Sequence, residues 1–167
     1  MTGSTELFDS EDSLMHRIEP ASRAILPTPP DDIRESTVVS TEELQGLRDR
    51  HPNVLIAGPS AAIAAAISEI YPLLRPPVTS VRIDRHAVLH LTLAPGTVIL
   101  RNIAALNRVE QERLRDWLAR MSATTQVVAT STTPVFPLVE RGAFLDSLYY
   151  RLNMTYFEVG GLRTPQA

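Results

Sequence analysis

The sequence predicts an α/β protein built on a parallel sheet, with helices covering both faces of that sheet. Short, continuously apolar runs such as Val54–Ala57 and Thr97–Leu100 are typical of strands that are buried on both faces. Segments with helical periodicity separate these runs, and the alternation continues from residue 41 to about residue 160. This order favours parallel strands, because each intervening helix carries the chain back to the edge where the next strand begins.

The first predicted helix begins at Thr41 and ends near Arg50. Glu42 and Glu43 lie in its first turn, where the helix dipole favours acids, and Pro52 prevents its continuation. The elements expected next are a strand at Val54–Ala57, a helix from Ala61 to Leu74, a strand at Val78–Ile83 and a short, half-exposed strand at Ala87–Leu93.

The strongest helix signal follows the strand at Thr97–Leu100. Asn107 is expected to cap this helix, and Glu110 occupies the capping-box position three residues later. The elements expected after it are a strand at Gln126–Ala129, a polar loop at Thr130–Thr133, a helix near Phe144–Leu152 and a strand at Met154–Val159. Ligands of parallel sheets bind beyond the carboxyl ends of the strands. The candidate functional positions are therefore Gly58–Ala62, Arg101–Asn102, Thr130–Thr133 and Arg151.

Composition divides the chain into an acidic leader at 1–40, an α/β core at 41–160 and a short tail at 161–167. The Ser- and Pro-rich leader is expected to be largely disordered, although a leader that folds back or docks a partner is an alternative. The absence of cysteine excludes disulfides and thiolate metal sites. No membrane span or signal peptide is recognisable, so we expect a cytoplasmic protein. His86 and His90 do not share a helical face and predict no metal site.

Several segments, in the right order from about residue 53 to residue 159, resemble one family. Tyr149-Tyr150-Arg151-Leu152-Asn153, within Gly142–Asn153, closely resembles a hallmark of the sigma-54-interacting AAA+ domain of bacterial enhancer-binding transcriptional regulators. Val54–Ser60 resembles the phosphate loop of that domain, Gly96–Ile103 its second phosphate-site motif and Val127–Ser131 the strand before its sensor. The resemblance implies a three-layer P-loop NTPase-like (AAA+) core and a role in transcription regulation.

The phosphate loop departs from the pattern that nucleotide binding requires. Such loops need glycines, a lysine for the β- and γ-phosphates and a Ser or Thr for Mg²⁺. Gly58 and Ser60 match and are the candidate cofactor-binding residues, but Ile63 replaces a glycine and Ala64 stands at the lysine position. All 16 basic residues counted as Lys or Arg are arginines. We therefore expect a plain strand-to-helix turn here.

The metal-binding motif departs from the family as well. Arg101 and Asn102 stand where the resemblance implies acids that hold Mg²⁺, and arginine cannot ligate a metal. We expect no metal site and no catalytic residues. Alternatively, Arg101 grips a phosphate or carboxylate directly. Thr132 aligns near the sensor position and could hydrogen-bond there.

The resemblance also bears on partners. The family has two trans-acting arginines; Leu145 replaces the first, whereas Arg151 matches the second and is the interface candidate. Only Asp84–Pro95 spans the interval of the family's sigma-contacting loop, so we do not expect direct contact with sigma-54. We also expect no helical lid domain. The sequence predicts neither a helix-turn-helix nor a basic patch, so we do not expect direct DNA binding.

The sequence therefore predicts a catalytically inactive AAA+ module, not an ATPase, that regulates or scaffolds transcription through protein–protein contacts. Its expected partner is itself or an AAA+ transcriptional regulator, and no cofactor is expected. The main alternative is an ATP- or ADP-binding AAA+ regulator with weak or no hydrolysis. An unrelated sensor or a non-functional remnant remains a further alternative.

Overall fold

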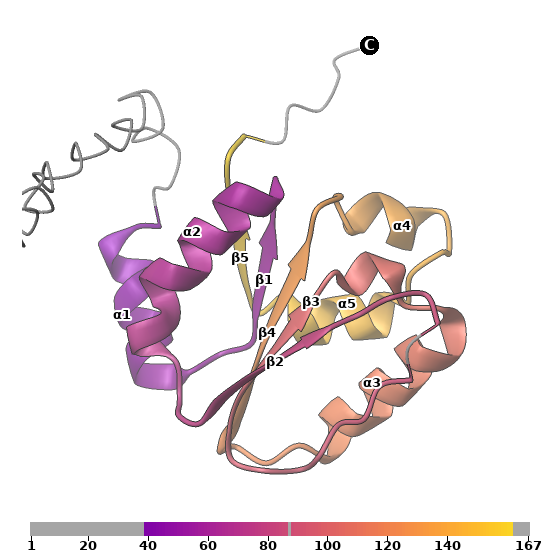
Figure 1. Ribbon diagram of the computed structural model, residues 1–167, viewed down its shortest axis with the longest axis horizontal. Helices are drawn as coiled ribbons and strands as arrows, with labels where there is room; N and C mark the ends of the chain where they lie inside the picture. Colours follow the sequence, from indigo (N-terminus) through magenta and orange to yellow (C-terminus); the bar gives the residue numbers. More distant parts are fainter. Residues whose placement is uncertain (1–38, 87, 162–167) are drawn as a thin grey trace, which may run out of the picture. The chain divides into compact units, whose positions relative to one another are not determined.

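The computed structural model describes residues 39–86 and 88–161, so nearly all of the predicted leader at 1–40 and tail at 161–167 lies outside the described residues. Within the described part, five strands form one sheet in the order β2-β3-β4-β1-β5, and every neighbouring pair is parallel (Figure 1). The strands are β1 (Val54–Ala57), β2 (Val78–Arg82), β3 (Gly96–Arg101), β4 (Thr125–Ser131) and β5 (Thr155–Glu158). The predicted α/β class with a parallel sheet is confirmed.

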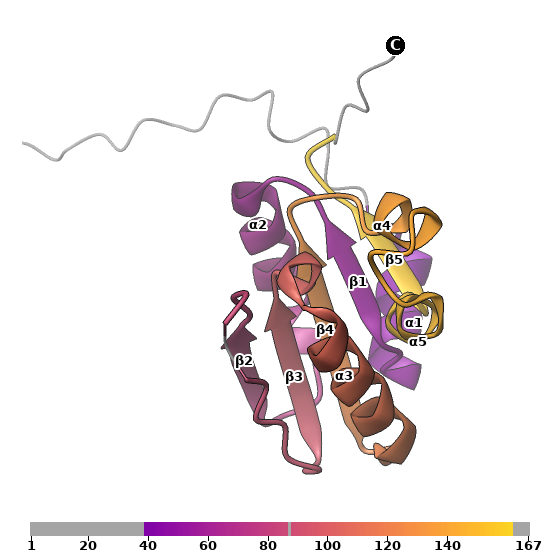
Figure 2. The same ribbon diagram turned by 90° about the vertical axis from the view of Figure 1, so that its right-hand side faces the viewer.

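Helices cover both faces of this sheet, as predicted. The helices are α1 (Thr41–Arg50), α2 (Ser60–Ile70), α3 (Arg108–Arg120), α4 (Phe136–Glu140) and α5 (Asp146–Leu152), with short 3-10 turns η2 (Tyr71–Leu73) and η3 (Ile103–Ala105). One buried cluster joins α1 and α2 to one face, and a second joins α3 and α5 to the other (Figure 2). Successive strand residues alternate between the clusters: Leu55 packs with α3 and α5, whereas Val54 and Ile56 pack with α1 and α2.

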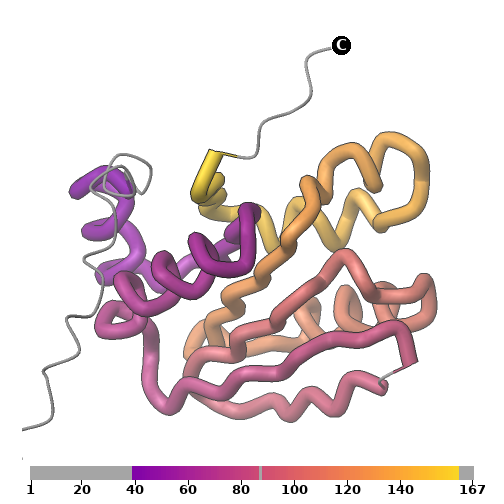
Figure 3. Tube along the Cα trace, turned by 45° about the horizontal axis from the view of Figure 1, so that its top comes forward, coloured from indigo at the N-terminus to yellow at the C-terminus, as the bar shows by residue number. Residues whose placement is uncertain are grey.

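The strand predicted at Ala87–Leu93 is wrong over residues 88–93, which form no strand. The backbone N–H of Leu89 donates to the Glu110 carboxylate on α3 at 3.0 Å, and Leu89 and Leu91 pack partly against the α3–α5 cluster. The alternation therefore marked a half-buried segment correctly, but this segment is held by a helix side chain and not by a neighbouring strand. Figure 3 follows its path from the end of β2 back to the start of β3.

Helix α1 begins at Thr41 as predicted, and Ser40 caps it through a reciprocal capping box with Glu43. Asn107 caps α3 as predicted, accepting from the Glu110 N–H at 3.0 Å. The Glu110 carboxylate binds Leu89 and Arg113 instead of completing a box.

The remaining boundaries shift by a few residues. Helix α2 ends at Ile70 and continues as the 3-10 turn η2, which contains Pro72. Helix α4 was not predicted, and α5 begins at Asp146. Among the described residues, no helix has both the length and the apolar character that crossing a bilayer requires.

Candidate functional site

The junction between β1 and α2 contains no extended loop. Only Gly58 and Pro59 separate the end of β1 from the first residue of α2. The Gly58 N–H donates to the Ser131 carbonyl at 3.1 Å, and a Cβ at Gly58 would lie 2.2 Å from the Val159 carbonyl oxygen. Glycine is therefore required at this position by the close approach of the backbone beyond β5.

The positions that would cradle a phosphate are already part of the helix. The Ile63 N–H donates to the Pro59 carbonyl at 2.9 Å, so it is committed to the first turn of α2. Ala64 lies in the second turn with an exposed side chain, whereas the neighbouring Ile63 is buried. The chain thus makes the plain strand-to-helix turn that the missing glycine favours.

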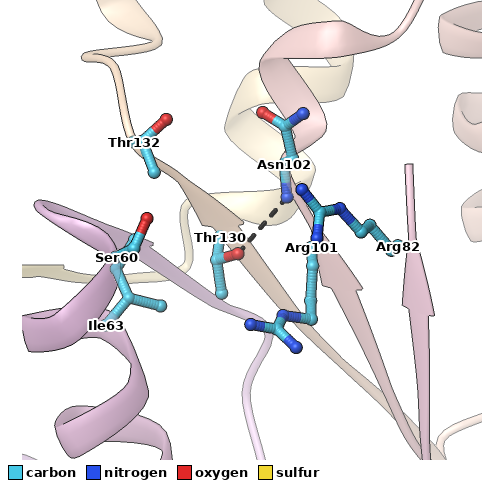
Figure 4. A pocket seen from close by; sticks show the side chains of 7 residues that line it. All are labelled: Ser60, Ile63, Arg82, Arg101, Asn102, Thr130 and Thr132. Carbon is cyan, nitrogen blue, oxygen red and sulfur yellow. Dashed lines mark hydrogen bonds between the residues drawn. The ribbon is translucent and has the colours of Figure 1, made fainter. Parts of the chain in front are cut away.

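A pocket of about 330 Å³ lies at the carboxyl ends of β2, β3 and β4, beside the start of α2 (Figure 4). It is lined by Ser60, Ile63, Arg82, Arg101, Asn102, Thr130 and Thr132. Five of these residues belong to the positions that the sequence nominated at the ends of strands. The structure adds Ile63 and Arg82, and it places neither Gly58 nor Arg151 in the lining.

Arg82 is the residue that sequence reasoning missed. It pairs in register with Arg101, and each is the last residue of its strand. The predicted strand at Val78–Ile83 contained Arg82, but the order of the strands was not predicted and so its neighbour was unknown. In Figure 4 the Arg82 side chain reaches from β2 toward Asn102, and the Arg101 guanidinium turns toward Ile63 on α2.

Asn102 connects the strand ends that surround the pocket. It adopts a left-handed backbone conformation with φ of 69°, which asparagine tolerates better than most residues. Its N–H donates to Thr130 Oγ1 at 3.4 Å, and its Nδ2 donates to the Ile83 carbonyl at 3.3 Å. These contacts tie the ends of β2, β3 and β4 together.

The pocket lining is cationic and contains no carboxylate. Within the described part of the chain, the ion pairs use Arg108, Arg113 and Arg115, and neither Arg82 nor Arg101 takes part in one. The lining offers Mg²⁺ only hydroxyl and amide oxygens beside two guanidinium groups, whereas Mg²⁺ is normally held through carboxylates and phosphates. The residues present therefore do not fit the Mg²⁺–nucleotide complex that P-loop proteins use.

Arg151 lies away from this pocket. It is exposed on α5, and its carbonyl accepts from Asn53 Nδ2 at 3.0 Å. Asn53 immediately precedes β1, so Arg151 is close to the amino-terminal edge of the sheet, and the pocket is at the opposite edge.

Aromatic side chains on α4 and α5 contact one another. The Tyr149 ring contacts those of Phe136 and Tyr150, with centroids 5.7 and 5.3 Å apart. Tyr150 is 64% exposed and Phe136 is 45% exposed. Burial, followed by the neighbouring Tyr150, raises the pKa of Tyr149 above its ordinary value.

The parallel sheet, its strand order and the site at its carboxyl edge define an α/β protein with the P-loop NTPase (AAA+) fold. The family model described as the sigma-54 interaction domain matches residues 41–162, and the chain belongs to this family.

Solved structures share this fold at low sequence identity. NtrX from Brucella abortus, in a crystal structure with ATP, matches at a TM-score of 0.57 and 15% identity, over 71% of this chain and 34% of that one. The P-loop NTPase domain of a sigma-54 activator from E. coli matches at 0.55 and 18% identity, over 70% of this chain and 93% of that one. This chain therefore spans about a third of the NtrX chain. No curated protein sequence is significantly similar to it.

Proposed function

We propose that this chain is a sigma-54 interaction domain that does not hydrolyse ATP and that regulates or scaffolds transcription through protein–protein contacts. The observation that carries this proposal is the cationic pocket at the carboxyl edge of the sheet. Two arginines occupy a lining that has no carboxylate, and α2 begins at Ser60, before the position that a phosphate-binding lysine would occupy.

The chemistry of phosphoryl transfer supports the loss of activity. P-loop enzymes bind the β- and γ-phosphates through backbone N–H groups and a lysine, and they neutralise the developing charge with Mg²⁺. Here Ala64 supplies no charge, and Arg101 repels a cation. Since each such group contributes orders of magnitude to the rate, their joint replacement leaves little catalytic power.

Exposed apolar side chains on α4, on α5 and around β5 support a role in protein contacts. The exposed apolar side chains there are Phe136, Tyr150, Met154 and Tyr156, and the exposed Arg151 lies among them in sequence. Aromatic residues, Met and Arg are enriched in protein interfaces. The partner proposed for this surface is a second copy of the chain or an AAA+ regulator.

Direct contact with sigma-54 does not form part of the proposal. Segment 88–95 occupies the interval in which the family's contacting loop is expected, and it is short and tied to α3 through the Leu89–Glu110 hydrogen bond. A segment held in this way is poorly suited to reach a distant partner.

Titration of the purified protein with ATP and with ADP, each with Mg²⁺ and with EDTA, tests catalytic inactivity. We expect no ATP turnover above the buffer background and no tightening of nucleotide binding by Mg²⁺. An active sigma-54 activator, assayed in parallel, is the positive control. Saturable, Mg²⁺-dependent binding in the micromolar range, or turnover, would contradict the proposal.

Light scattering coupled to size exclusion, together with pull-down against an AAA+ regulator, tests the contact surface. We expect Tyr150→Ser and Arg151→Ala to weaken the association, whereas Arg120→Ala on α3 leaves it unchanged. Absence of any association, with itself or with an AAA+ relative, would rule out the proposed partner contact.

The alternative function is ATP or ADP binding without efficient hydrolysis. The position of the pocket beyond the carboxyl ends of the strands favours it, because ligands of parallel α/β sheets bind there. The same titrations distinguish the two functions, since this alternative requires saturable nucleotide binding.

A further inference from the structure

We propose that the pocket at the carboxyl edge of the sheet binds a phosphate group directly, without a metal ion, through Arg82 and Arg101. This inference rests on the proposed function in one respect: it takes the site to hold two arginines in place of the carboxylates that would bind a metal ion. The ligand is inorganic phosphate or the terminal phosphate of an ester.

The first argument is the placement of the two arginines. Arg82 and Arg101 are register partners on adjacent parallel strands, and both line the same pocket. Like charges directly opposite each other on neighbouring strands destabilise a sheet. No carboxylate lines the pocket, and neither guanidinium forms an ion pair within the described residues. A bound anion would relieve this repulsion.

The second argument is the arrangement of hydrogen-bond donors around the pocket. Thr130 Oγ1 accepts from the Asn102 N–H, so its own hydroxyl hydrogen is available to donate. The hydroxyls of Ser60 and Thr132 also line the pocket, from α2 and from the segment after β4. Donors that line one pocket from α2, β3 and β4 suit a tetrahedral anion, which accepts hydrogen bonds on every side, better than a planar carboxylate.

The third argument is electrostatic and comes from α2. Pro59 precedes this 11-residue helix and supplies no capping side chain, so the first-turn N–H groups lack a capping partner. The positive end of the helix dipole therefore adds to the two guanidinium charges, with Ser60 at the pocket wall. An arginine guanidinium also binds phosphate through two parallel N–H···O hydrogen bonds, and this contact requires no Mg²⁺.

Calorimetry and thermal unfolding with inorganic phosphate, in a low-salt buffer free of phosphate and sulfate, test this site. We expect phosphate to bind in EDTA and to raise the unfolding temperature. Arg101→Ala and Arg82→Ala should each weaken binding roughly ten- to hundred-fold, the range for losing a charged hydrogen bond. The matched control is Arg120→Ala, which removes the same charge at the far end of α3.

A second readout separates ligand binding from a structural role. Because the paired arginines repel each other, Arg101→Ala should be at least as stable as the parent protein in phosphate-free buffer. In phosphate buffer the order should reverse, since only the parent protein gains stability from the ligand. An Arg101→Ala variant that is less stable in both buffers, with unchanged phosphate affinity, would assign Arg101 a purely structural role and overturn the proposal.

The source of the phosphate is distinguished by comparing inorganic phosphate, ATP in EDTA and succinate. Comparable affinities for phosphate and ATP indicate a free-phosphate site, and much tighter ATP binding indicates a nucleotide ester; both support the proposal. Tighter binding of succinate, or no phosphate binding at millimolar concentration, overturns it. Mg²⁺-dependent ATP binding would instead refute the proposed function, while arginine-dependent phosphate binding in EDTA would still stand.

Discussion

Gly58 has a packing role in the sheet that does not depend on a ligand. Its N–H donates to the Ser131 carbonyl, and the space that a side chain would need is taken by the backbone of Val159. The glycine therefore packs β1 against the continuation of β5. The packing of the sheet requires glycine here, irrespective of any phosphate.

Substitution of Gly58 by alanine should destabilise the fold by about 1–3 kcal/mol or more, because the new Cβ would lie 2.2 Å from a backbone oxygen. The matched control is Gly46→Ala in α1, where the Cβ would meet only the end of the flexible Arg50 side chain. Within a helix that change should be neutral or stabilise by about 0.5–1 kcal/mol. Urea unfolding measures both; equal effects would contradict the packing role of Gly58.

At the scale of elements, Glu110 links the capping turn of α3 to a segment that has no secondary structure. Its side chain is buried, and its two carboxylate oxygens bind the Leu89 N–H at 3.0 Å and the Arg113 guanidinium at 2.7 Å. One carboxylate thus holds segment 88–95 against α3. Without this anchor, the segment retains the partial packing of Leu89 and Leu91 and, at its far end, the hydrogen bond from Thr125 Oγ1 to the Ala94 carbonyl at 2.8 Å.

Glu110→Ala should release segment 88–95 and speed tryptic cleavage after Arg85 several-fold, because cleavage follows local opening. Its control, Glu112→Ala, removes an exposed ion pair with Arg108 and should leave the cleavage rate unchanged. Mass spectrometry of timed digests identifies the site. Cleavage at the parent rate in Glu110→Ala would show that the other contacts of the segment hold it without this carboxylate.

At the scale of the whole molecule, the sheet separates two buried clusters that share its strands. Leu148 belongs to the cluster with α3 and α5, and Ile70 belongs to the cluster with α1 and α2; both are fully buried. Because strands such as β1 and β4 contribute side chains to both clusters, neither layer can lose its packing independently of the sheet.

Leu148→Ala and Ile70→Ala should each lower the free energy of unfolding by about 2–5 kcal/mol through the cavity that each creates. Far-UV circular dichroism and Trp117 fluorescence should report the same transition in both variants, since the two layers unfold together. Trp117 lies in the Leu148 cluster. A Trp117 transition that stays at the parent midpoint in Ile70→Ala would contradict this coupling.

Much of the fold could be predicted because its signals are local. The apolar runs that became β1 and β3, and the Asn107 cap of α3, depend only on neighbouring residues. Helix α4 was missed because it has only five residues and contains Pro137. The strand expected at Ala87–Leu93 failed over 88–93 because alternation reports a half-buried segment without saying what covers it.

The candidate site, like the fold, could be predicted from the sequence only in part. The sequence alone determined the family resemblance, the alanine at position 64 and the arginine at position 101, since these are residue identities. Only the tertiary structure decided that Arg82 stands opposite Arg101 and that Glu110 binds Leu89. Those contacts join segments about 20 residues apart, and they arise from strand register and helix packing, which local sequence patterns do not specify.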